Sequence, residues 1–356
     1  MRVHPVNALF NALNHYDMLD RRTALKVFAS CALVQTLAPH RAHAQTNDST
    51  ELIRASMFGV IGDGKSNDRA RLQAAIDSTV GKTLLIEGRC RMDTRGLDLH
   101  SSTHLRFADG ASIKLLPHDT PSYQMIRIWD ADNVLLENAT LDGSKELNAA
   151  PPETHDGGYG MGISIAGSTN VTINSATTIG CWGDGLYIAN SYERATRRSR
   201  NIVVRDHHAR ACRRQGVSLI SGMNVLIERG VWEDIGGTAP SAGIDIEPNS
   251  NRDVLEDIRI VDPLTRRCSI GILVYLAELP GPKPKTVSIE ISGQRDESSS
   301  DNAFSVSGLD TKGWTVKGSV TNVSPVWVNS RLASVESVDY DKRGPAIVVS
   351  GLRLIR

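Results

Sequence analysis

The 356-residue sequence has few aromatic residues, 5% in all, and no excess of charge of either sign. Its 40 basic side chains balance 40 acidic ones, so the composition does not predict binding to nucleic acid or to an anionic membrane surface, both of which attract basic patches. Beyond the N-terminal region, no segment reaches the roughly 20 apolar residues that a membrane helix needs. We therefore expect no nucleic-acid partner and no membrane association of the mature protein.

The N-terminal 44 residues have the features of a twin-arginine export signal. Arg21–Arg22 precede the apolar stretch VFASCALVQTLA, and AHA at Ala42–Ala44 offers a cleavage site. An ordinary amphipathic helix that happens to begin with two arginines is the alternative. The long segment before the arginines leaves open whether translation starts at Met1 or Met18. We expect residues 1–44 to be removed and the protein to be periplasmic or secreted.

The stretch GVIGDGKSND at Gly59–Asp68 contains G-x-x-x-x-G-K-S, the Walker A pattern of nucleotide-binding P-loops. A P-loop follows a buried apolar strand, whereas the run before this stretch, ELIRASMF, carries charge at Glu51 and Arg54. No convincing Walker B strand ending in Asp comes later. We therefore expect that the protein binds no nucleotide.

The longer segment FGVIGDGKSNDRARLQAAID, at Phe58–Asp77, resembles the entry segment of the pectin lyase-like superfamily. That resemblance implies an all-β fold, a single-stranded right-handed parallel β-helix or solenoid, with an N-terminal capping helix. Asn67 or Asp68 can cap a helix that starts near Arg69. Three apolar residues then give this helix one face that can cover the open end of a sheet stack: Leu72, Ala75 and Ile76.

A short motif recurs along the chain: a glycine, an aliphatic residue, any residue and a second aliphatic residue. The copies are GISI at Gly162–Ile165, GLYI at Gly185–Ile188, GVSL at Gly216–Leu219, GIDI at Gly243–Ile246 and GILV at Gly271–Val274. A second repeat, Asn followed by Val or Ile, opens alternating apolar segments at Asn133, Asn170, Asn201 and Asn224. Strands this short must stack on their neighbours to bury one face. The repeats favour one solenoid domain over residues 51–356, with a two-sheet sandwich as the alternative.

Stacking places equivalent residues of the five glycine-led copies in columns, and polar residues gather in the columns that face outward. The middle positions form the column Ser164, Tyr187, Ser218, Asp245 and Leu273. Two positions later the column reads Ala166, Ala189, Ile220, Glu247 and Tyr275. The positions just before the glycines add Asp184, Arg214 and Gln215. This mixture suits a carbohydrate, on which carboxylates do acid–base work and an aromatic ring stacks. A solvated face with charges at random is the alternative.

The same columns are similar to the strands of the polygalacturonase family, which belongs to that superfamily. YGMGISI, WGDGLYI, RRQGVSL and AGIDIEPN agree with the family in register but not in chemistry. Of the three catalytic aspartates that the family implies, only Asp184 is matched. Met161 and Gly183 occupy the other two positions, and Gln215 replaces a histidine.

Asp245 and Glu247 stand where the family's Arg and Lys bind an anionic galacturonate. Acids at these positions would repel a polyuronate strongly if desolvated. We therefore expect a polysaccharide or oligosaccharide substrate other than simple polygalacturonate: a neutral or amino sugar, or a substrate held through a cation.

The acids predict a glycoside hydrolase that needs no cofactor. Inverting glycosidases separate their carboxyls by roughly 6.5–9.5 Å and retaining ones by about 5–5.5 Å. Strand geometry puts Asp245 and Glu247 about 6.5–7 Å apart at the backbone, and Asp184 two turns from Asp245, so both pairs fit inversion. We predict Asp184 as the general acid and Asp245 or Glu247 as the group that activates water. The predicted substrate-binding residues are Tyr187, Arg214, Gln215, Ser218 and Tyr275.

Two other classes of function stay open. In a polysaccharide lyase or uronate epimerase, Tyr187 beside Arg214 would be the base, and the acids could hold calcium. His155 and Asp156, in the loop ETHDGGYG, could overhang the same face, although a simple glycine-rich turn explains that loop as well. The third class is a non-catalytic glycan-binding β-helix.

Cys181 and Cys212 each lie four residues before the glycine of their copy. They should therefore stack on neighbouring turns, about 4.8 Å apart at the backbone. A ladder of free thiols inside the solenoid is the simpler interpretation, and a disulfide in an oxidising compartment is the alternative. The cysteine spacings do not suggest a zinc site.

Overall fold

A computed structural model describes residues 51–150, 158–308, 313–330, 334–335 and 344–356. The chain divides into two compact units, Met1–Asp48 and Ser49–Arg356, and the first lies outside the described residues. The export signal predicted at 1–44 and the loop residues His155 and Asp156 are also outside them. The helices of the described part are too short or too polar to cross a membrane.

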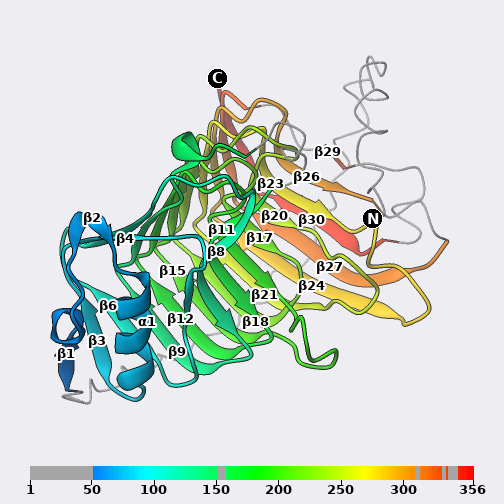
Figure 1. Cartoon of the computed structure of the whole chain (residues 1–356). Helices are drawn as coiled ribbons and strands as arrows, with labels where there is room; N and C mark the ends of the chain where they lie inside the picture. The colour runs from blue at the N-terminus through cyan, green and yellow to red at the C-terminus, as the bar shows by residue number, and fades with distance from the viewer. Residues whose placement is uncertain (1–50, 151–157, 309–312, 331–333, 336–343) are drawn as a thin grey trace, which may run out of the picture. The chain divides into compact units, whose positions relative to one another are not determined.

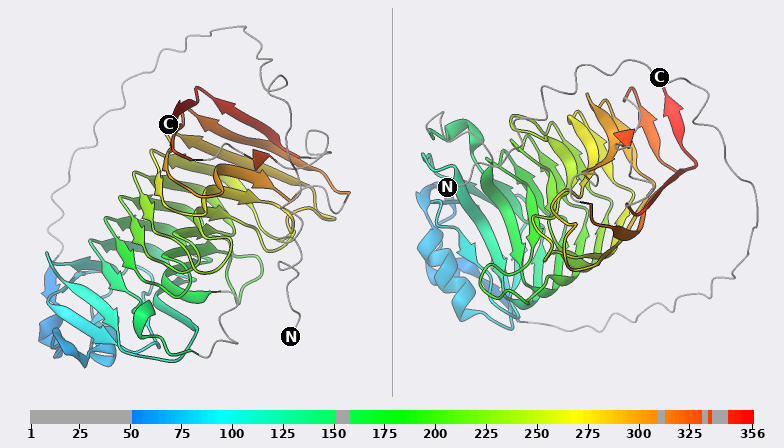
Figure 2. Two further views of the ribbon diagram at one scale, coloured as in Figure 1. Left: turned by 90° about the horizontal axis from the view of Figure 1, so that it is seen from above. Right: turned by 90° about the vertical axis from the view of Figure 1, so that its right-hand side faces the viewer.

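The second unit consists of three parallel sheets, and the chain adds one strand to each sheet on most turns (Figures 1 and 2). The first sheet contains β1 (Leu52–Arg54), β3 (Thr83–Ile86), β6 (His104–Phe107), β9 (Asp132–Glu137), β12 (Thr169–Asn174), β15 (Arg200–Arg205), β18 (Gly222–Glu228), β21 (Leu255–Val261), β24 (Lys285–Ser292), β27 (Val316–Val323) and β30 (Ala346–Ser350). The second contains β2 (Asp63–Asn67), β4 (Arg89–Met92), β7 (Ser112–Leu115), β10 (Thr140–Asp142), β13 (Thr177–Ile179), β16 (His208–Arg210), β19 (Val231–Glu233), β22 (Leu264–Arg266), β25 (Arg295–Glu297), β28 (Val326–Val328) and β31 (Arg353–Ile355). The third contains β5 (Leu97–Asp98), β8 (Ser122–Trp129), β11 (Tyr159–Ala166), β14 (Leu186–Ala189), β17 (Val217–Leu219), β20 (Ala242–Ile246), β23 (Ile270–Tyr275), β26 (Asn302–Ser307) and β29 (Ser334–Val335). The predicted parallel β-helix is confirmed.

The register of the third sheet confirms the predicted columns. Ser164 pairs with Tyr187, Tyr187 with Ser218, Ser218 with Asp245 and Asp245 with Leu273. The aliphatic residues on either side of each middle position point inward and are fully buried, as with Ile244 and Ile246. Alternation along each strand therefore separates a core face from an outward face, as the two-residue period requires.

The second repeat marks a row of asparagines at the start of first-sheet strands. Asn133, Asn170, Asn201 and Asn224 all have φ between 52° and 62°, a left-handed conformation that asparagine tolerates better than most residues. Each later amide donates to the one before it, with Nδ2 to Oδ1 distances of 2.9–3.0 Å. The row thus fixes the same bend on successive turns.

Helix α1 (Arg69–Ser78) lies beside the first turns, with Leu72, Ala75 and Ile76 fully buried as predicted (Figure 1). Its capping differs from the expectation in part. Asn67 Oδ1 accepts from the backbone N–H of Arg69 at 3.1 Å. Asp68 makes no capping bond to the helix, because its carboxylate accepts from the N–H groups of Ile61 and Gly62 at 2.8 and 2.9 Å.

Two short 3-10 helices, η2 (Ala55–Phe58) and η3 (Lys145–Leu147), complete the regular structure of the described residues. The Gly-Lys-Ser of the Walker-like stretch lies in strand β2. The backbone N–H groups of Lys65 and Ser66 donate to the Asp63 carboxylate, at 2.8 and 2.7 Å. In a P-loop, such groups would point at phosphate instead.

The four cysteines of the described part are free thiols, and all are buried. The backbone N–H of Arg213 donates to the carbonyl of Cys181 at 3.0 Å, which places Cys212 on the turn directly after Cys181. Contact with the Cys212 thiol, together with burial, raises the pKa of Cys181 well above its ordinary value. The structure therefore has the thiol ladder rather than a disulfide.

Candidate functional site

The candidate site lies on the outward face of the third sheet, on β14, β17 and β20. Tyr187, Ser218 and Asp245 are neighbours in one column, as their register requires. Their exposed fractions are only 8%, 0% and 1%, although the column faces away from the core. Polar side chains on an outward face are ordinarily solvated, so this part of the face is covered by neighbouring side chains and loops.

Asp184 and Arg214 form a buried ion pair. Asp184 comes just before Gly185, which leads into β14, and Arg214 comes two residues before Gly216, which leads into β17. Arg214 Nε donates to Asp184 Oδ1 at 2.8 Å, and a terminal guanidinium nitrogen donates to Oδ2 at 2.5 Å. Ser218 Oγ donates to the same Oδ2 at 3.0 Å. Asp184 is fully buried and the Arg214 side chain is 18% exposed. A bidentate guanidinium and a hydroxyl donor stabilise the ionised carboxylate.

Burial alone would lower the pKa of Arg214. The charge of Asp184 and its hydrogen bonds outweigh that effect and raise the pKa instead, with smaller contributions from Asp245 and Tyr187. Arg214 therefore stays a cation between two carboxyl groups. Its guanidinium contacts Asp184 directly and acts on Asp245 through its charge.

Asp245 is in the opposite situation, because no cationic side chain among the described residues contacts it directly. Gln215 Nε2 donates to Asp245 Oδ2 at 3.0 Å, and the other end of that amide accepts from the N–H of Ala242 at 2.8 Å. Asp245 Oδ1 receives no hydrogen bond from any described donor, and the neighbouring group is the carboxyl of Glu247. Burial first, and then the charge and contact of Glu247, raise the pKa of Asp245 well above its ordinary value, against a lowering effect of Arg214.

Two ionised carboxylates offer each other no hydrogen-bond donor, so this contact favours a protonated Asp245. Because its pKa is raised, Asp245 keeps its proton above the pH at which an isolated carboxyl would lose it. Glu247 is the partly exposed member and Asp245 the buried one. The carboxyls meet, so they lie closer together than the roughly 6.5–9.5 Å of inverting or the about 5–5.5 Å of retaining glycosidases, although the backbone spacing of alternate strand residues is about 6.5–7 Å.

A glycine explains why the carboxylates of the polygalacturonase pattern are missing here. A Cβ at Gly183 would lie 2.3 Å from the carbonyl oxygen of Gly158, closer than any real side chain approaches backbone. Met161, at another of those positions, is buried at 4% exposure. The place of those aspartates is thus filled by backbone and an apolar side chain, and the acids lie further along the stack.

Two aromatic side chains that the sequence interpretation missed lie beside the column. Trp129, at the end of β8, donates from Nε1 to Ser164 Oγ at 2.9 Å and contacts the ring of Tyr192 edge-on, with 4.9 Å between centroids. They are 39% and 57% exposed. Trp129 pairs with Ala166, so extending the second outward column by one turn would have found it. Tyr192 lies in the loop after β14, where no periodic signal exists.

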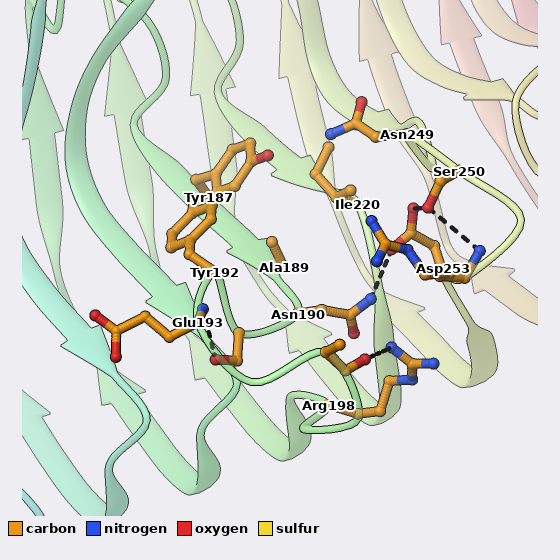
Figure 3. A pocket seen from close by; sticks show the side chains of 13 residues that line it. Tyr187, Ala189, Asn190, Tyr192, Glu193, Arg198, Ile220, Asn249, Ser250 and Asp253 are labelled. Carbon is orange, nitrogen blue, oxygen red and sulfur yellow. Dashed lines mark hydrogen bonds between the residues drawn. The ribbon is translucent and has the colours of Figure 1, made fainter.

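A pocket of about 280 Å³ opens next to Tyr187 (Figure 3). The loop after β14 and the loop after β20 form its walls. Its lining residues are Tyr187, Ala189, Asn190, Ser191, Tyr192, Glu193, Ala195, Arg198, Ile220, Asn249, Ser250, Arg252 and Asp253. Tyr187 belongs both to this pocket and to the column that contains Ser218 and Asp245. The pocket therefore adjoins the carboxyl cluster, by which we mean Asp184, Asp245 and Glu247.

Of the remaining predicted substrate-binding residues, two are buried and one is partly exposed. Gln215 and Ser218 are fully buried, and their polar groups bond to Asp245, Ala242 and Asp184 as described. Tyr275 ends β23, one turn beyond Glu247, and is partly exposed. Among the described side chains, no group of three or more His, Cys, Asp or Glu is arranged to hold a metal ion.

No family model matches the sequence. The chain is 25% identical over 229 residues to YclG, an uncharacterized protein of Bacillus subtilis (strain 168), covering 57% of this chain and 39% of that protein. It is 26% identical over 164 residues to YorA, an SPbeta prophage-derived uncharacterized protein of the same organism, covering 43% of this chain and 28% of that protein. The chain therefore spans well under half the length of the curated relatives it matches.

Three solved structures share the fold. An iota-carrageenase complexed to iota-carrageenan fragments has a TM-score of 0.63 at 10% identity, covering 90% of this chain and 93% of its own. The tailspike of E. coli bacteriophage HK620, in complex with a hexasaccharide, has a TM-score of 0.65 at 12% identity, covering 85% and 56%. The polygalacturonase of Erwinia carotovora ssp. carotovora has a TM-score of 0.57 at 11% identity, covering 90% and 95%. The chain therefore shares the right-handed parallel β-helix fold of these three proteins.

Proposed function

We propose that the protein is an exported carbohydrate-active enzyme that hydrolyses glycosidic bonds in a polysaccharide other than simple polygalacturonate. The observation that carries this proposal is the Asp245–Glu247 pair, in which burial and a second carboxyl raise the pKa of Asp245. Perturbed carboxyl pairs of this kind are typical of sites that do acid–base chemistry. The export part rests on the signal predicted at residues 1–44 alone.

The pair can supply the proton that hydrolysis needs. The glycosidic oxygen must receive a proton as its bond to the sugar breaks, and the attacking water must lose one. Burial and the neighbouring Glu247 raise the pKa of Asp245, so this carboxyl keeps a proton that an isolated carboxyl would lose. Glu247 is the member open to the substrate, and Asp245 shares its proton from the buried side.

Asp184 is reassigned in this proposal from general acid to positioning residue. Its oxygens already accept from Arg214 and Ser218, and the side chain is fully buried. A buried carboxyl whose two oxygens are both bonded to protein groups has no free oxygen to present to a glycosidic bond. Asp184 instead fixes Arg214, whose charge lies close enough to Asp245 to limit the rise of its pKa. Gln215 and Ser218 likewise orient carboxyls rather than contact sugar.

The aromatic side chains support a sugar ligand. Trp129 and Tyr192 are partly exposed, contact each other, and adjoin the column through Ser164. Aromatic faces bind the apolar faces of sugar rings by burying area without a need for charge. The iota-carrageenase and the HK620 tailspike bind iota-carrageenan fragments and a hexasaccharide respectively, which agrees with a polysaccharide partner here.

The lyase or epimerase alternative has less support from the geometry. A Tyr187 base would have to ionise, yet burial, and to a lesser extent Tyr192, raise the pKa of Tyr187. Arg214, which would neutralise a uronate, is already bonded to Asp184. The calcium that a lyase could use would need oxygen ligands on the same face, and both oxygens of Asp184 and one of Asp245 already accept hydrogen bonds from protein groups.

The experiment that tests the proposal is a polysaccharide screen with the mature protein, scored for new reducing ends and for unsaturated products. Glu247→Gln and the matched control Glu290→Gln, at an exposed first-sheet position, are screened in parallel. Hydrolysis predicts reducing ends without unsaturation, lost in Glu247→Gln and kept in the control. Unsaturated products would instead identify a lyase. Saturable binding to a glycan without turnover would identify a binding protein.

A further inference from the structure

The pocket beside Tyr187 contains two arginines that are not used by the fold. Arg198 and Arg252 line it, and neither forms an ion pair with a described residue. The side chain of Arg198 makes one long bond, 3.5 Å from a guanidinium nitrogen to the carbonyl of Ala195. Its neighbour Arg197 differs, because it bonds to Asp130 at 3.3 Å and to Asp132 at 2.9 Å.

One of the two carboxylates that line the pocket is already engaged. Asp253 is buried, and its two oxygens accept from Asn190 at 2.6 Å and from Ser250 at 3.0 Å. Lys285 adds a further positive charge by donating to the backbone carbonyl of Asp253 at 2.6 Å. Burial, and next the charge of Arg198, lower the pKa of Lys285, which indicates that the cations crowd one another.

Arg198 and Glu193 lie on different sides of the pocket. Figure 3 shows Arg198, Asn190 and Asp253 on one side and the carboxylate of Glu193 extending away on the other. Arg252, which precedes Asp253 in the chain, also lines the pocket, and both oxygens of the Asp253 carboxylate already accept hydrogen bonds. An oxyanion bound there would gain charge-assisted bonds from guanidinium groups without displacing an existing ion pair.

We propose that this pocket is a subsite for an anionic group carried by the polysaccharide, held by Arg198 and Arg252 next to the bond that is cleaved. The inference rests on the proposed function, since it names the substrate class of the same site. The volume of about 280 Å³ lies at the lower end of small-molecule sites, which suits one sugar unit and its substituent.

The subsite refines the substrate expected from the carboxyl cluster. The Asp245–Glu247 pair disfavours an anionic unit directly against it, whereas the adjoining pocket favours one. A chain that alternates neutral and anionic sugars satisfies both. Carboxylate, sulfate and phosphate share the required chemistry, and the test must separate them.

The test follows the side-chain Nε–Hε signals of ¹⁵N-labelled arginines in the mature protein by NMR. The probes are four monosaccharides: glucuronate, glucose 6-sulfate, glucose 6-phosphate and neutral glucose. Arg198→Ala and Arg252→Ala assign the two signals by removing them. Arg200→Ala, at an exposed position on β15 outside the pocket, is the control.

We expect a saturable shift of both signals with at least one anionic probe and none with glucose. Either pocket variant should weaken that binding at least about tenfold, which is 1.4 kcal/mol, and the control should not change it. The anion that binds tightest identifies the source of the charge. Absence of saturable shifts with all three anions, or equal shifts with glucose, would overturn the subsite. The probes contain no glycosidic bond in the chain, so this outcome is independent of whether the protein hydrolyses one.

Discussion

Two outward faces of the β-helix carry stacked charged residues, and they differ in burial. On the second sheet, a row of ion pairs joins the side chains of successive turns, with distances of 2.6–3.1 Å. Its members are His208, Glu233, Arg266, Glu297 and Arg295, all partly exposed. On the third sheet, Asp184 and Asp245 are almost completely buried.

The difference shows that charge in a column does not by itself indicate function. Exposed pairs are screened by water and contribute about 0–1 kcal/mol each, so the second-sheet row is a solvated surface. Buried carboxyls must be paired, hydrogen-bonded or protonated: Asp184 is paired with Arg214, whereas Asp245 accepts from Gln215 and has a raised pKa. Maintaining such groups is costly to the fold, which favours a functional role.

The largest expected effect comes from removing the accessible acid. Glu247→Gln keeps the shape but cannot exchange a proton, so turnover should fall by about 10²–10⁴-fold. Stability should stay the same or rise, because a like charge leaves the side of Asp245. Turnover on the substrate found in the screen and a denaturant midpoint measure the two effects. Wild-type turnover in this variant would remove Glu247 from the mechanism.

The next largest effect is a loss of stability when the buried ion pair of the third sheet is broken. Arg214→Met leaves the Asp184 carboxylate buried without its cation, which should cost about 3–5 kcal/mol. Adding Asp184→Leu removes the orphaned charge and should restore much of the loss. Chemical denaturation of both variants measures it. A single variant as stable as wild type would mean that water reaches Asp184 and that this face is not truly buried.

A third prediction concerns pH. Asp245 has a raised pKa in the folded protein, so the folded state holds this proton more tightly than the unfolded chain. Its contribution to stability is present below the unfolded pKa of about 3.9 and is lost as the pH rises through the folded value. Asp245→Asn should therefore gain stability relative to wild type from about pH 4 upward. The gain is about 1.4 kcal/mol for each unit by which the folded pKa exceeds the unfolded one.

Denaturant midpoints at a series of pH values give this difference. A difference independent of pH would show that Asp245 titrates normally. The same comparison in a Glu247→Gln background is a second test. Loss of the second carboxyl should reduce the rise of the Asp245 pKa, and stability should then change less with pH.

A smaller effect is expected at the aromatic edge. Trp129→Ala should weaken glycan binding by about 1 kcal/mol, or roughly fivefold, because a stacking surface is lost while the carboxyls stay in place. Trp129→Phe, which keeps a ring but loses the bond to Ser164, should retain most of the affinity. Isothermal titration with the Glu247→Gln background measures binding without turnover. If both variants bind the glycan as tightly as the protein with Trp129, no sugar stacks on this ring.

How far sequence alone leads can be judged from the same residues. The columns were predictable because side chains alternate along a strand and glycines mark the copies, so Ser218 and Asp245 could be placed side by side. Trp129 was missed because β8 lacks the leading glycine. Tyr192 was missed because a loop has no period.

The roles of the acids were less predictable than their positions. Whether Asp184 donates or stays ionised depends on the direction in which Arg214 points from the next turn, and a repeat pattern does not specify that direction. The pKa of Asp245 depends first on burial, which a repeat pattern does not specify. Pattern therefore predicts which residues share a face, while burial decides what they can do.

The smallest expected effect is the loss of stability when an exposed ion pair of the second sheet is broken. Arg266 bonds to Glu233 at 3.1 Å and to Glu297 at 2.6 Å, yet all three side chains are partly exposed. Arg266→Gln should therefore cost less than about 1 kcal/mol and leave turnover unchanged, since solvent replaces the lost contacts. A double-mutant cycle with Glu297→Gln isolates the pair, and its coupling should shrink further in high salt. A coupling of several kcal/mol, or a change in turnover, would mean that the second-sheet row is also shielded from water, and burial would no longer distinguish the two faces.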